Sequence, residues 1–577
     1  MRLRSFTVLI AAVFCFGLVT PPAFSTPVPS AGAQLQAVYA QGLQRELKNS
    51  PEAATFLGVY EYDGNWGKSG IAGVRQGRQF VGRFEAAVNR IDFSYANLHD
   101  RNDLKIARAF IAGQKRNITE ALQGKDAGGP PLQVVGIFFT MLLHKDEQNP
   151  TVWWDHVISR MEKAPALLAG DKTLITHPGR LQAEVAQRQL AQAPALFTYI
   201  LTPMAAASLP KDKLARFTKA RDGLVASLTA WNKWLADNSP KWPQNFAMGR
   251  TAYNGMLKNE LLLPYDAVGI ESIGQHTLDV AIADEQAILA EAKAKGIDLN
   301  DPVQAAKVGG GPTPTTRDAQ FAFFQTQLDA LQSFIKSNHI VTVPPYMGVM
   351  KIETTPQFLQ PVLPGPSMNA PPLLSKERDG VYFIPPPNPQ MASNPKLFED
   401  FDRDRVLMTS GHEGFPGHFL QLSIAKHNPD AVRRFSFDGV FAEGWAFYEE
   451  SLLRQMGLYG DDLDGRYAVA QFERLRGARA IVDAKLATGE WSFDQALTWF
   501  QKNAGVDADT AQGEVSRHAL GPGQAFDYAV GRTQILDLLA KYKAKKGNKF
   551  TLQSFHDDLL SHGTVPLSIV ASEVLAE

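Results

Sequence analysis

Two histidines and a glutamate lie close together in the segment Gly411–Gln421, and their types suit metal-dependent hydrolysis. His412 and Glu413 are adjacent, and His418 follows six residues after His412. Zinc hydrolases often carry a His-Glu pair on a helix with a second His four residues from the first, so that both imidazoles bind one ion. The glutamate then acts as general base for the zinc-bound water. The segment is therefore a candidate metal site, with His412 and His418 as ligands and Glu413 as base.

The spacing of six departs from that pattern. Six residues turn through roughly 240° on a regular helix, so a straight helix would not present both histidines to one metal. Pro416 and Gly417 lie between them. Proline removes a backbone donor and glycine relaxes φ, so together they can bulge or break the helix and restore the effective spacing. The alternative is a loop with two unrelated histidines, and the spacing by itself leaves both open.

A catalytic zinc ion takes three protein ligands and keeps a fourth position for water. The segment Ala442–Glu450 offers the third ligand, Glu443, which lies 25 residues after His418. Glu450 lies seven residues further on, on nearly the same helical face, and is a candidate partner that orients a ligand histidine. The alternative is a solvated acidic face, which we expect for Glu449.

Neutral donors aimed at the developing oxyanion lower the barrier to peptide hydrolysis. Tyr528, which follows the turn-forming Gly521-Pro522-Gly523, and His556 are the candidates for this role, and we group them with Glu413 as catalytic residues. The alternative is that both are core residues. The strand-type run Asp379–Ile384 precedes the metal segment, and we expect it either to hold an extended substrate at a sheet edge or to form a simple surface hairpin.

Most of the chain that must position these residues has helical patterning. Gln34–Leu47 and Arg317–Lys336 carry apolar residues at helical intervals. Between residues 340 and 389, prolines alternate with short β-type runs such as Val341–Val343 and Val381–Ile384, which predicts a small irregular sheet. The predicted fold is therefore mainly α with a small β insert near 340–389.

The first 25 residues are typical of a secretory signal peptide. Arg2 and Arg4 precede the apolar run Phe6–Thr20, and the small-residue site Ala23–Ser25 follows. The alternative is a membrane anchor, but the run is short for a span. We expect cleavage, export to the periplasm or the medium, a helical region at 26–339 and a metal-binding catalytic region at 340–577. No linker is long enough to separate the two regions as free domains.

Composition excludes several classes of protein. Lys+Arg 58 against Asp+Glu 59 gives a net charge of -1, which provides no electrostatic attraction to nucleic acid. The single cysteine, Cys15, excludes a disulfide scaffold and a Cys-ligated metal. After signal cleavage we expect no stable membrane span. The uncharged stretch Ala191–Pro210 is punctuated by prolines and predicts a buried helix pair with a turn at Pro203.

The chain resembles a bacterial family called domain of unknown function 885, whose members look like zinc metallopeptidases. The resemblance spans nearly the whole chain after the signal peptide and rests on five segments: Pro51–Thr55 with Gly58, His412–His418, Glu443–Glu450, Gly521–Gly531, and Phe555–Asp557 with Gly563. It implies a helical, bowl-like zincin-type enzyme that binds Zn²⁺ at His412, His418 and Glu443, with Glu413 as base. One departure is Ala487, where members often carry a histidine.

The leading hypothesis is an exported zinc-dependent peptidase that acts on small peptides. A zinc amidase or esterase acting on a non-peptide is the second, because the same water attacks either carbonyl. A non-catalytic peptide-binding protein is the third. The His and carboxylate ligands also suit manganese or cobalt.

Overall fold

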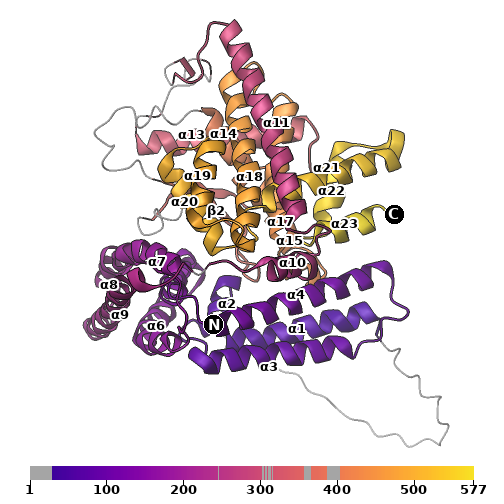
Figure 1. Cartoon of the computed structure of the whole chain (residues 1–577). Helices are drawn as coiled ribbons and strands as arrows, with labels where there is room; N and C mark the ends of the chain where they lie inside the picture. The colour runs from indigo at the N-terminus through magenta and orange to yellow at the C-terminus, as the bar shows by residue number, and fades with distance from the viewer. Residues whose placement is uncertain are drawn as a thin grey trace, which may run out of the picture.

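The computed structural model describes residues 29–576, apart from residue 245, residues 302, 303, 306, 307, 309–313 and 315, and the segments 357–364 and 386–402. The signal peptide expected at 1–25 lies outside the described residues. The chain folds mainly into α-helices with one three-stranded sheet, which confirms the predicted fold class (Figure 1).

The N-terminal helices form a layer along one side of the molecule (Figure 1). Ser30 and Asn97 cap two of them, because their side chains accept hydrogen bonds from backbone N–H groups of the first turn. Apolar residues of this layer, such as Leu35 and Phe84, join the largest hydrophobic core. The helices are α1 (Ala31–Asn49), α2 (Pro51–Leu57), α3 (Gly70–Asn89) and α4 (Leu98–Gln123).

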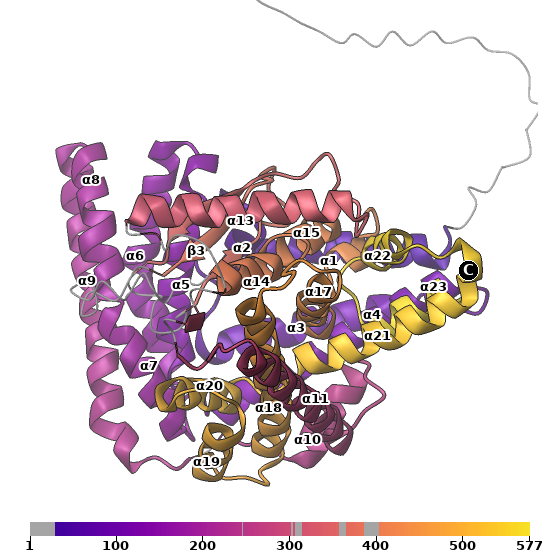
Figure 2. The same cartoon turned by 90° about the horizontal axis from the view of Figure 1, so that it is seen from above.

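A bundle at the edge of the molecule follows, with α8 and α9 outermost in Figure 2. It has a hydrophobic core of its own, built from residues between Ala127 and Leu235. Its elements are α5 (Gly129–Leu143), α6 (Pro150–Lys172), α7 (Arg180–Gln192), the π-helical η3 (Leu196–Leu201), α8 (Thr202–Ser208) and α9 (Lys211–Asn238).

The predicted turn at Pro203 is wrong. Residues Arg180–Ser208 run on as one long helix, and the π-helical η3 lies just before Pro203, where the missing proline N–H would interrupt an α-helix. By length and composition, this is the one helix among the described residues that could cross a membrane, although core helices of soluble proteins pass the same criterion. Its apolar residues, including Leu190, Phe197 and Leu201, pack in the core of the bundle.

The remaining helices follow the bundle in the sequence and include those that carry the candidate site. They are α10 (Arg250–Asn259), α11 (Ala267–Ala294), α13 (Arg317–Ser337), α14 (Arg403–Glu413), α15 (His418–Lys426), α16 (Ala431–Arg434), α17 (Gly439–Gln455), α18 (Leu463–Thr488), α19 (Phe493–Asn503), α20 (Ala508–Leu520), α21 (Asp527–Lys546), α22 (Leu552–Ser561) and α23 (Leu567–Val574).

Glycine lets two of these helices touch beside the site. A Cβ on Gly444 of α17 would lie 2.4 Å from the Cα of Gly531 of α21, so only glycine allows this approach. The close crossing holds Glu443, the neighbour of Gly444, next to the first turn of α21.

The sheet contains β1 (Met350–Thr354), β2 (Ser367–Asn369) and β3 (Gly380–Ile384) in the order β1-β3-β2. β1 runs parallel to β3, with Met350 opposite Gly380, and β2 runs antiparallel, with Ser367 opposite Phe383. The expectation of a strand at Val341–Val343 is wrong, and Val341 packs in the main core instead. The expectation that Asp379–Ile384 lies at an edge is also wrong, because β3 is the central strand.

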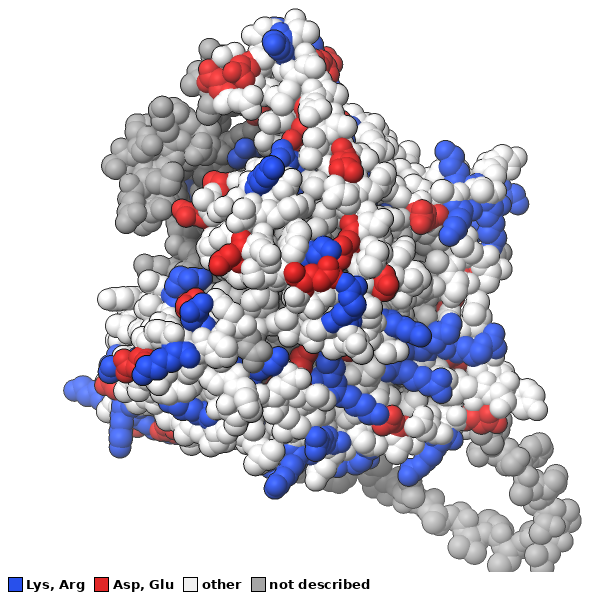
Figure 3. All heavy atoms as spheres, viewed as in Figure 1, with Lys and Arg blue, Asp and Glu red and all other residues white. Residues whose placement is uncertain are grey.

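The largest core draws on both regions proposed from the sequence. It contains Leu35 and Phe84 from the N-terminal layer together with Phe419, Trp445 and residues as late as Val574. On the face shown in Figure 3, acidic side chains lie among basic ones, and basic side chains predominate in its lower half.

Candidate metal centre

A break between α14 and α15 brings the two histidines together. α14 ends at Glu413, and α15 begins at His418. In the connection, Gly417 N donates to Gly411 O at 3.0 Å and Leu420 N donates to Gly414 O at 3.3 Å, so both hydrogen bonds span six residues. The His412 and His418 ring centroids lie 4.7 Å apart. The interrupted helix expected from Pro416 and Gly417 is thus present, and it overcomes the unfavourable spacing.

Glu443 on α17 completes a group of three ligand-type side chains. Its Oε2 atom lies 3.3 Å from His418 Nε2 and 3.6 Å from His412 Nε2. The three atoms lie within 4.8 Å of one another. Oε2 is buried and has no hydrogen-bond partner among the described residues. An unpartnered carboxylate oxygen between two imidazole nitrogens fits a zinc ion, whose protein ligands are of these types.

Glu450 fixes the tautomer of His412. Its Oε1 lies 2.7 Å from His412 Nδ1 and also accepts a hydrogen bond from Arg476 Nη2 at 2.9 Å. Because a carboxylate accepts, Nδ1 carries the hydrogen, and the neutral ring then directs the Nε2 lone pair towards Glu443. The partner role expected for Glu450 agrees with this geometry. Arg476 was not identified from the sequence, since it lies on α18 and no local motif marks it.

The electrostatics of the group indicate a missing positive charge. Burial alone would lower the pKa of His412, but the nearby carboxylates of Glu443 and Glu450 outweigh it and raise the pKa to about 9. Burial would raise the pKa of Glu443, yet the two histidines hold it well below its usual range. Without a metal, His412 would hold a proton beside Glu443, and a metal ion would supply the same positive charge.

Glu413 lies beside the ligand group and the edge strand. Burial raises the pKa of its carboxyl, which His412 and His418 partly offset. The same carboxyl accepts a hydrogen bond from the backbone of Met368 in β2. A base needs a pKa near the working pH, so the raised value suits proton transfer. The sheet edge beside the metal group is therefore β2, whose short sequence gave no strand signal.

Tyr528 on α21 faces the group. Its ring stacks on His412 with centroids 6.2 Å apart, and its hydroxyl accepts a hydrogen bond from Gln524 Nε2 at 3.3 Å. Gln524 Nε2 also reaches Glu443 Oε1 at 3.5 Å. Burial and the charge of Glu443 raise the pKa of Tyr528 to about 12, while Arg479 opposes the shift. The hydroxyl therefore stays protonated at neutral pH and retains its own hydrogen for donation.

The turn before α21 is anchored from α18. Asp483 accepts hydrogen bonds from the backbone N–H groups of Gly523 at 3.0 Å and Ala525 at 3.1 Å, and from the Tyr253 hydroxyl at 2.8 Å. These bonds fix the position of Gln524 between them. Ala487, one turn further along α18, is buried, and its carbonyl accepts from Met248 N and Gly249 N. Its side chain lies in an apolar cluster with Tyr253.

His556 does not join the metal group. It is fully buried on α22, its Nδ1 lies 2.7 Å from Ile340 O, and its Nε2 lies 3.0 Å from the Tyr448 hydroxyl. No ligand of the metal group is among its contacts in the described part of the chain. The structure thus supports the core interpretation of His556 over the catalytic one, because both ring nitrogens are already engaged.

The expectation that Glu449 lies on a solvated face is wrong. Its side chain is fully buried, and both carboxyl oxygens lack hydrogen-bond partners among the described residues. Burial raises its pKa well above the usual range, so it is held as the neutral acid. Its side chain lies 3.9 Å from His556 Nε2, and α17 is buried on nearly all sides, which a Glu-Glu pair in the sequence did not indicate.

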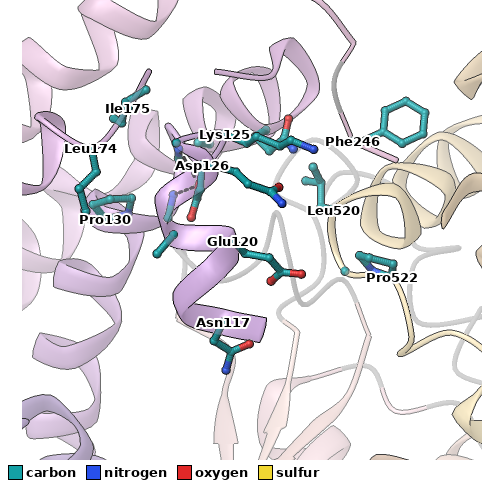
Figure 4. A pocket seen from close by; sticks show the side chains of 18 of the residues that line it. Asn117, Glu120, Lys125, Asp126, Pro130, Leu174, Ile175, Phe246, Leu520 and Pro522 are labelled. Atoms are coloured by element: carbon teal, nitrogen blue, oxygen red, sulfur yellow. Dashed lines mark hydrogen bonds between the residues drawn. The ribbon is translucent and has the colours of Figure 1, made fainter. Parts of the chain in front are cut away.

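A cavity of about 920 Å³ opens beside the turn that carries Gln524. Residues of α4, α7 and the segment after α20 line it, and Figure 4 shows Glu120, Lys125, Phe246, Leu520 and Pro522 around it. Pro522 and Gln524 are two residues apart, so one turn contributes to the cavity wall and to the metal group. The lining mixes charged, polar and apolar side chains.

We expect Glu450→Gln to weaken zinc binding by about 10- to 100-fold, because the neutral amide holds the Nδ1 proton of His412 less strongly and leaves Arg476 without its charge partner. Competition with a chromogenic chelator measures the affinity. The matched control is Glu449→Gln, the adjacent buried carboxyl that does not contact His412. Equal zinc affinity in wild type and Glu450→Gln would contradict the orienting role.

Comparisons with known proteins confirm the family that the sequence resembles. Residues 51–574 match the family described as "Bacterial protein of unknown function (DUF885)". No curated protein matches the chain. A solved structure of "a putative lipoprotein of unknown function" from Shewanella oneidensis is similar, with a TM-score of 0.76 and 20% identity over 95% of this chain and 100% of that one. A second, "the putative lipoprotein" from Colwellia psychrerythraea, has a TM-score of 0.77 and 18% identity over 95% and 99%.

Proposed function

The chain belongs to the bacterial family DUF885, and we propose that it is an exported zinc-dependent peptidase that cleaves small peptides. One observation carries the proposal: the unpartnered Oε2 of Glu443 lies between the Nε2 atoms of His412 and His418, with Glu413 beside them. Two imidazoles, one carboxylate and an adjacent glutamate are one of the sets that zinc hydrolases use.

His412, His418 and Glu443 would hold the ion. Zinc bound there supplies a Lewis acid that polarises the scissile carbonyl and lowers the pKa of a water molecule. The chain itself keeps His412 in the required tautomer through Glu450 and keeps Glu443 ionised. Manganese or cobalt fits the same ligands, so metal content is a necessary measurement.

Glu413 and Tyr528 have complementary roles in the proposed reaction. Glu413 takes a proton from the attacking water and passes it to the nitrogen of the leaving amine, which its raised pKa favours. Tyr528, protonated and with its hydroxyl hydrogen available, donates to the oxygen of the carbonyl as negative charge develops there.

Two features support a peptide as the substrate. β2 is an edge strand next to Glu413, and an extended peptide can pair with such an edge through backbone hydrogen bonds. The cavity beside Gly521 and Pro522 offers space for a flanking part of the substrate, with polar and apolar walls. Export is supported by the signal-type segment at 1–25 and by the lipoprotein descriptions of the two similar structures.

Incubation of the purified protein with a defined mixture of short peptides, followed by mass spectrometry, tests the proposal. We expect cleavage with zinc present, none after chelation, and recovery when zinc is restored. A parallel panel of amide and ester conjugates distinguishes a peptidase from an amidase or esterase. Cleavage of these conjugates without cleavage of any peptide would favour the amidase or esterase hypothesis. Peptide binding without turnover in zinc-loaded protein would favour the binding-protein alternative.

We expect Tyr528→Phe to lower kcat about 100-fold or more with unchanged zinc content, because the variant lacks the donor aimed at the oxyanion. Since the pKa of Tyr528 is about 12, the loss should be constant between about pH 6 and 9. Tyr199→Phe, at a residue that is 76% exposed, is the control. A change in KM alone would instead assign Tyr528 to substrate binding.

A further inference from the structure

A second group of ligand-type residues lies away from the elements of the metal centre. His99 and Asp103 on α4, Asp430 at the start of α16 and Glu573 on α23 meet around Arg433 of α16. We call these five residues the His99 cluster. A cavity of about 500 Å³ adjoins it, lined by His99, Asp430, Arg433 and Glu573 among others. The cluster joins the N-terminal layer to the C-terminal helices.

Asp103 and Asp430 each direct the Oδ2 atom towards His99 Nε2, while their Oδ1 atoms accept hydrogen bonds from other groups. Asp103 Oδ1 accepts from Arg433 Nε at 3.0 Å, and Asp430 Oδ1 accepts from Val432 N at 2.8 Å as the cap of α16. Their Oδ2 atoms lie 3.4 Å and 3.1 Å from His99 Nε2. Ligands bound at about 2.1 Å from a metal ion lie roughly 3.0 to 3.4 Å from one another, so these separations match the edges of a coordination polyhedron.

The charges of the cluster do not balance when its histidines are neutral. Asp103, Asp430 and Glu573 contribute three negative charges, and Arg433 contributes one positive charge. All four are buried. His562 in its neutral form adds no positive charge to the cluster. Its Nδ1 lies 2.7 Å from the carbonyl oxygen of Asp558, so Nδ1 carries the hydrogen of the neutral ring. Its Nε2 lone pair then faces Glu573 Oε2 at 3.3 Å.

Both ring nitrogens of His99 face carboxylates of the cluster. Nε2 faces Asp103 and Asp430, and Nδ1 lies 3.6 Å from Glu573 Oε2. A carboxylate at Nδ1 fixes the tautomer that leaves the Nε2 lone pair free for a metal ion. A divalent cation would cancel the two excess negative charges with both histidines neutral.

One further buried group lies within electrostatic reach of the two aspartates. The Tyr39 hydroxyl on α1 has no hydrogen-bond partner among the described residues, and the side chain is 7% exposed. The charges of Asp103 and Asp430 add to burial in raising its pKa. An unpartnered buried hydroxyl is costly, and water on a bound ion would provide its partner.

We propose that His99 Nε2, Asp103 Oδ2 and Asp430 Oδ2 bind a divalent transition-metal ion such as Mn²⁺, which ties α4 to the segment that enters α16. One imidazole and two carboxylates suit manganese or zinc better than calcium, which takes oxygen ligands. Arg433 does not compete for these atoms, because it holds the Oδ1 atom of Asp103 and the carboxylate of Glu573. Gln36 Nε2 donates to Asp430 Oδ2, and a carboxylate oxygen can accept this hydrogen bond through its second lone pair while it binds an ion. The adjoining cavity and the 46% exposure of the His99 side chain give the ion access.

Mn²⁺ binding to metal-stripped protein tests the proposal without reference to peptidase activity. The free Mn²⁺ signal in electron paramagnetic resonance is titrated at pH 7.5 with His418→Ala, which removes a ligand of the first centre, and with His418→Ala/His99→Gln. We expect the double variant to bind one equivalent less, or to bind that equivalent more than about 100-fold more weakly. Mn²⁺ should also raise the melting temperature of His418→Ala and not that of the double variant.

The matched control is His418→Ala/His276→Gln, since His276 is exposed on α11 and belongs to none of the three ligand-type groups among the described residues. It should bind Mn²⁺ like His418→Ala. Equal stoichiometry and affinity with and without His99 would overturn the proposal.

Discussion

Glu413→Gln is expected to lower kcat for peptide hydrolysis by about 100- to 10,000-fold while zinc stays bound at wild-type stoichiometry. Glutamine has nearly the same shape and can still accept the hydrogen bond from Met368, but it does not take a proton from water. The zinc ligands His412, His418 and Glu443 are untouched, so binding and turnover should separate. The measurements are metal analysis and steady-state kinetics on the same preparations.

The control for Glu413→Gln is Glu449→Gln, a buried carboxyl on α17 that is held neutral and does not contact the metal ligands. It should retain kcat per folded molecule. Wild-type turnover in Glu413→Gln would rule out the proposed base and, with it, the mechanism. Loss of zinc from the same variant would instead give Glu413 a part in holding the ion.

His418→Ala should lose one equivalent of zinc relative to wild type, together with peptide hydrolysis. The remaining ligands, His412 Nε2 and Glu443 Oε2, are too few for a tightly bound catalytic zinc ion. The Glu443 carboxylate also loses one of the two imidazoles that keep it ionised. Inductively coupled plasma mass spectrometry on dialysed protein measures the metal, and peptide turnover measures the consequence.

His427→Ala, at the C-cap residue of the same helix, is the matched control. Its Nδ1 lies 2.8 Å from Ser423 O, and its ring stacks on Tyr346 at 4.0 Å, away from the metal ligands. This variant should keep its zinc. If His418→Ala held as much zinc as wild type at equal affinity, the two histidines would not share an ion, and the break between α14 and α15 would have only a structural role.

The residue types that could do chemistry are readable in the sequence. His412, Glu413, His418 and Glu443 were identified from their types and spacing, and the interrupted helix between the histidines was expected from Pro416 and Gly417. The mainly α fold and the small β insert also followed from periodicity and proline content. These features are local, because they depend on neighbours within one or two helical turns.

Contacts between distant segments were decided only by the tertiary structure. The hydrogen bond between Arg476 and Glu450 joins residues 26 positions apart, and no local motif marks Arg476. Burial of Glu449 on α17 and of His556 on α22 depends on how these helices pack among their neighbours, which their own sequences do not specify. The central place of β3 arises from pairing with β1 and β2, which lie on separate segments. Sequence spacing indicates which residues share one face of a helix. Side-chain burial and strand pairing depend instead on which helices and strands pack together.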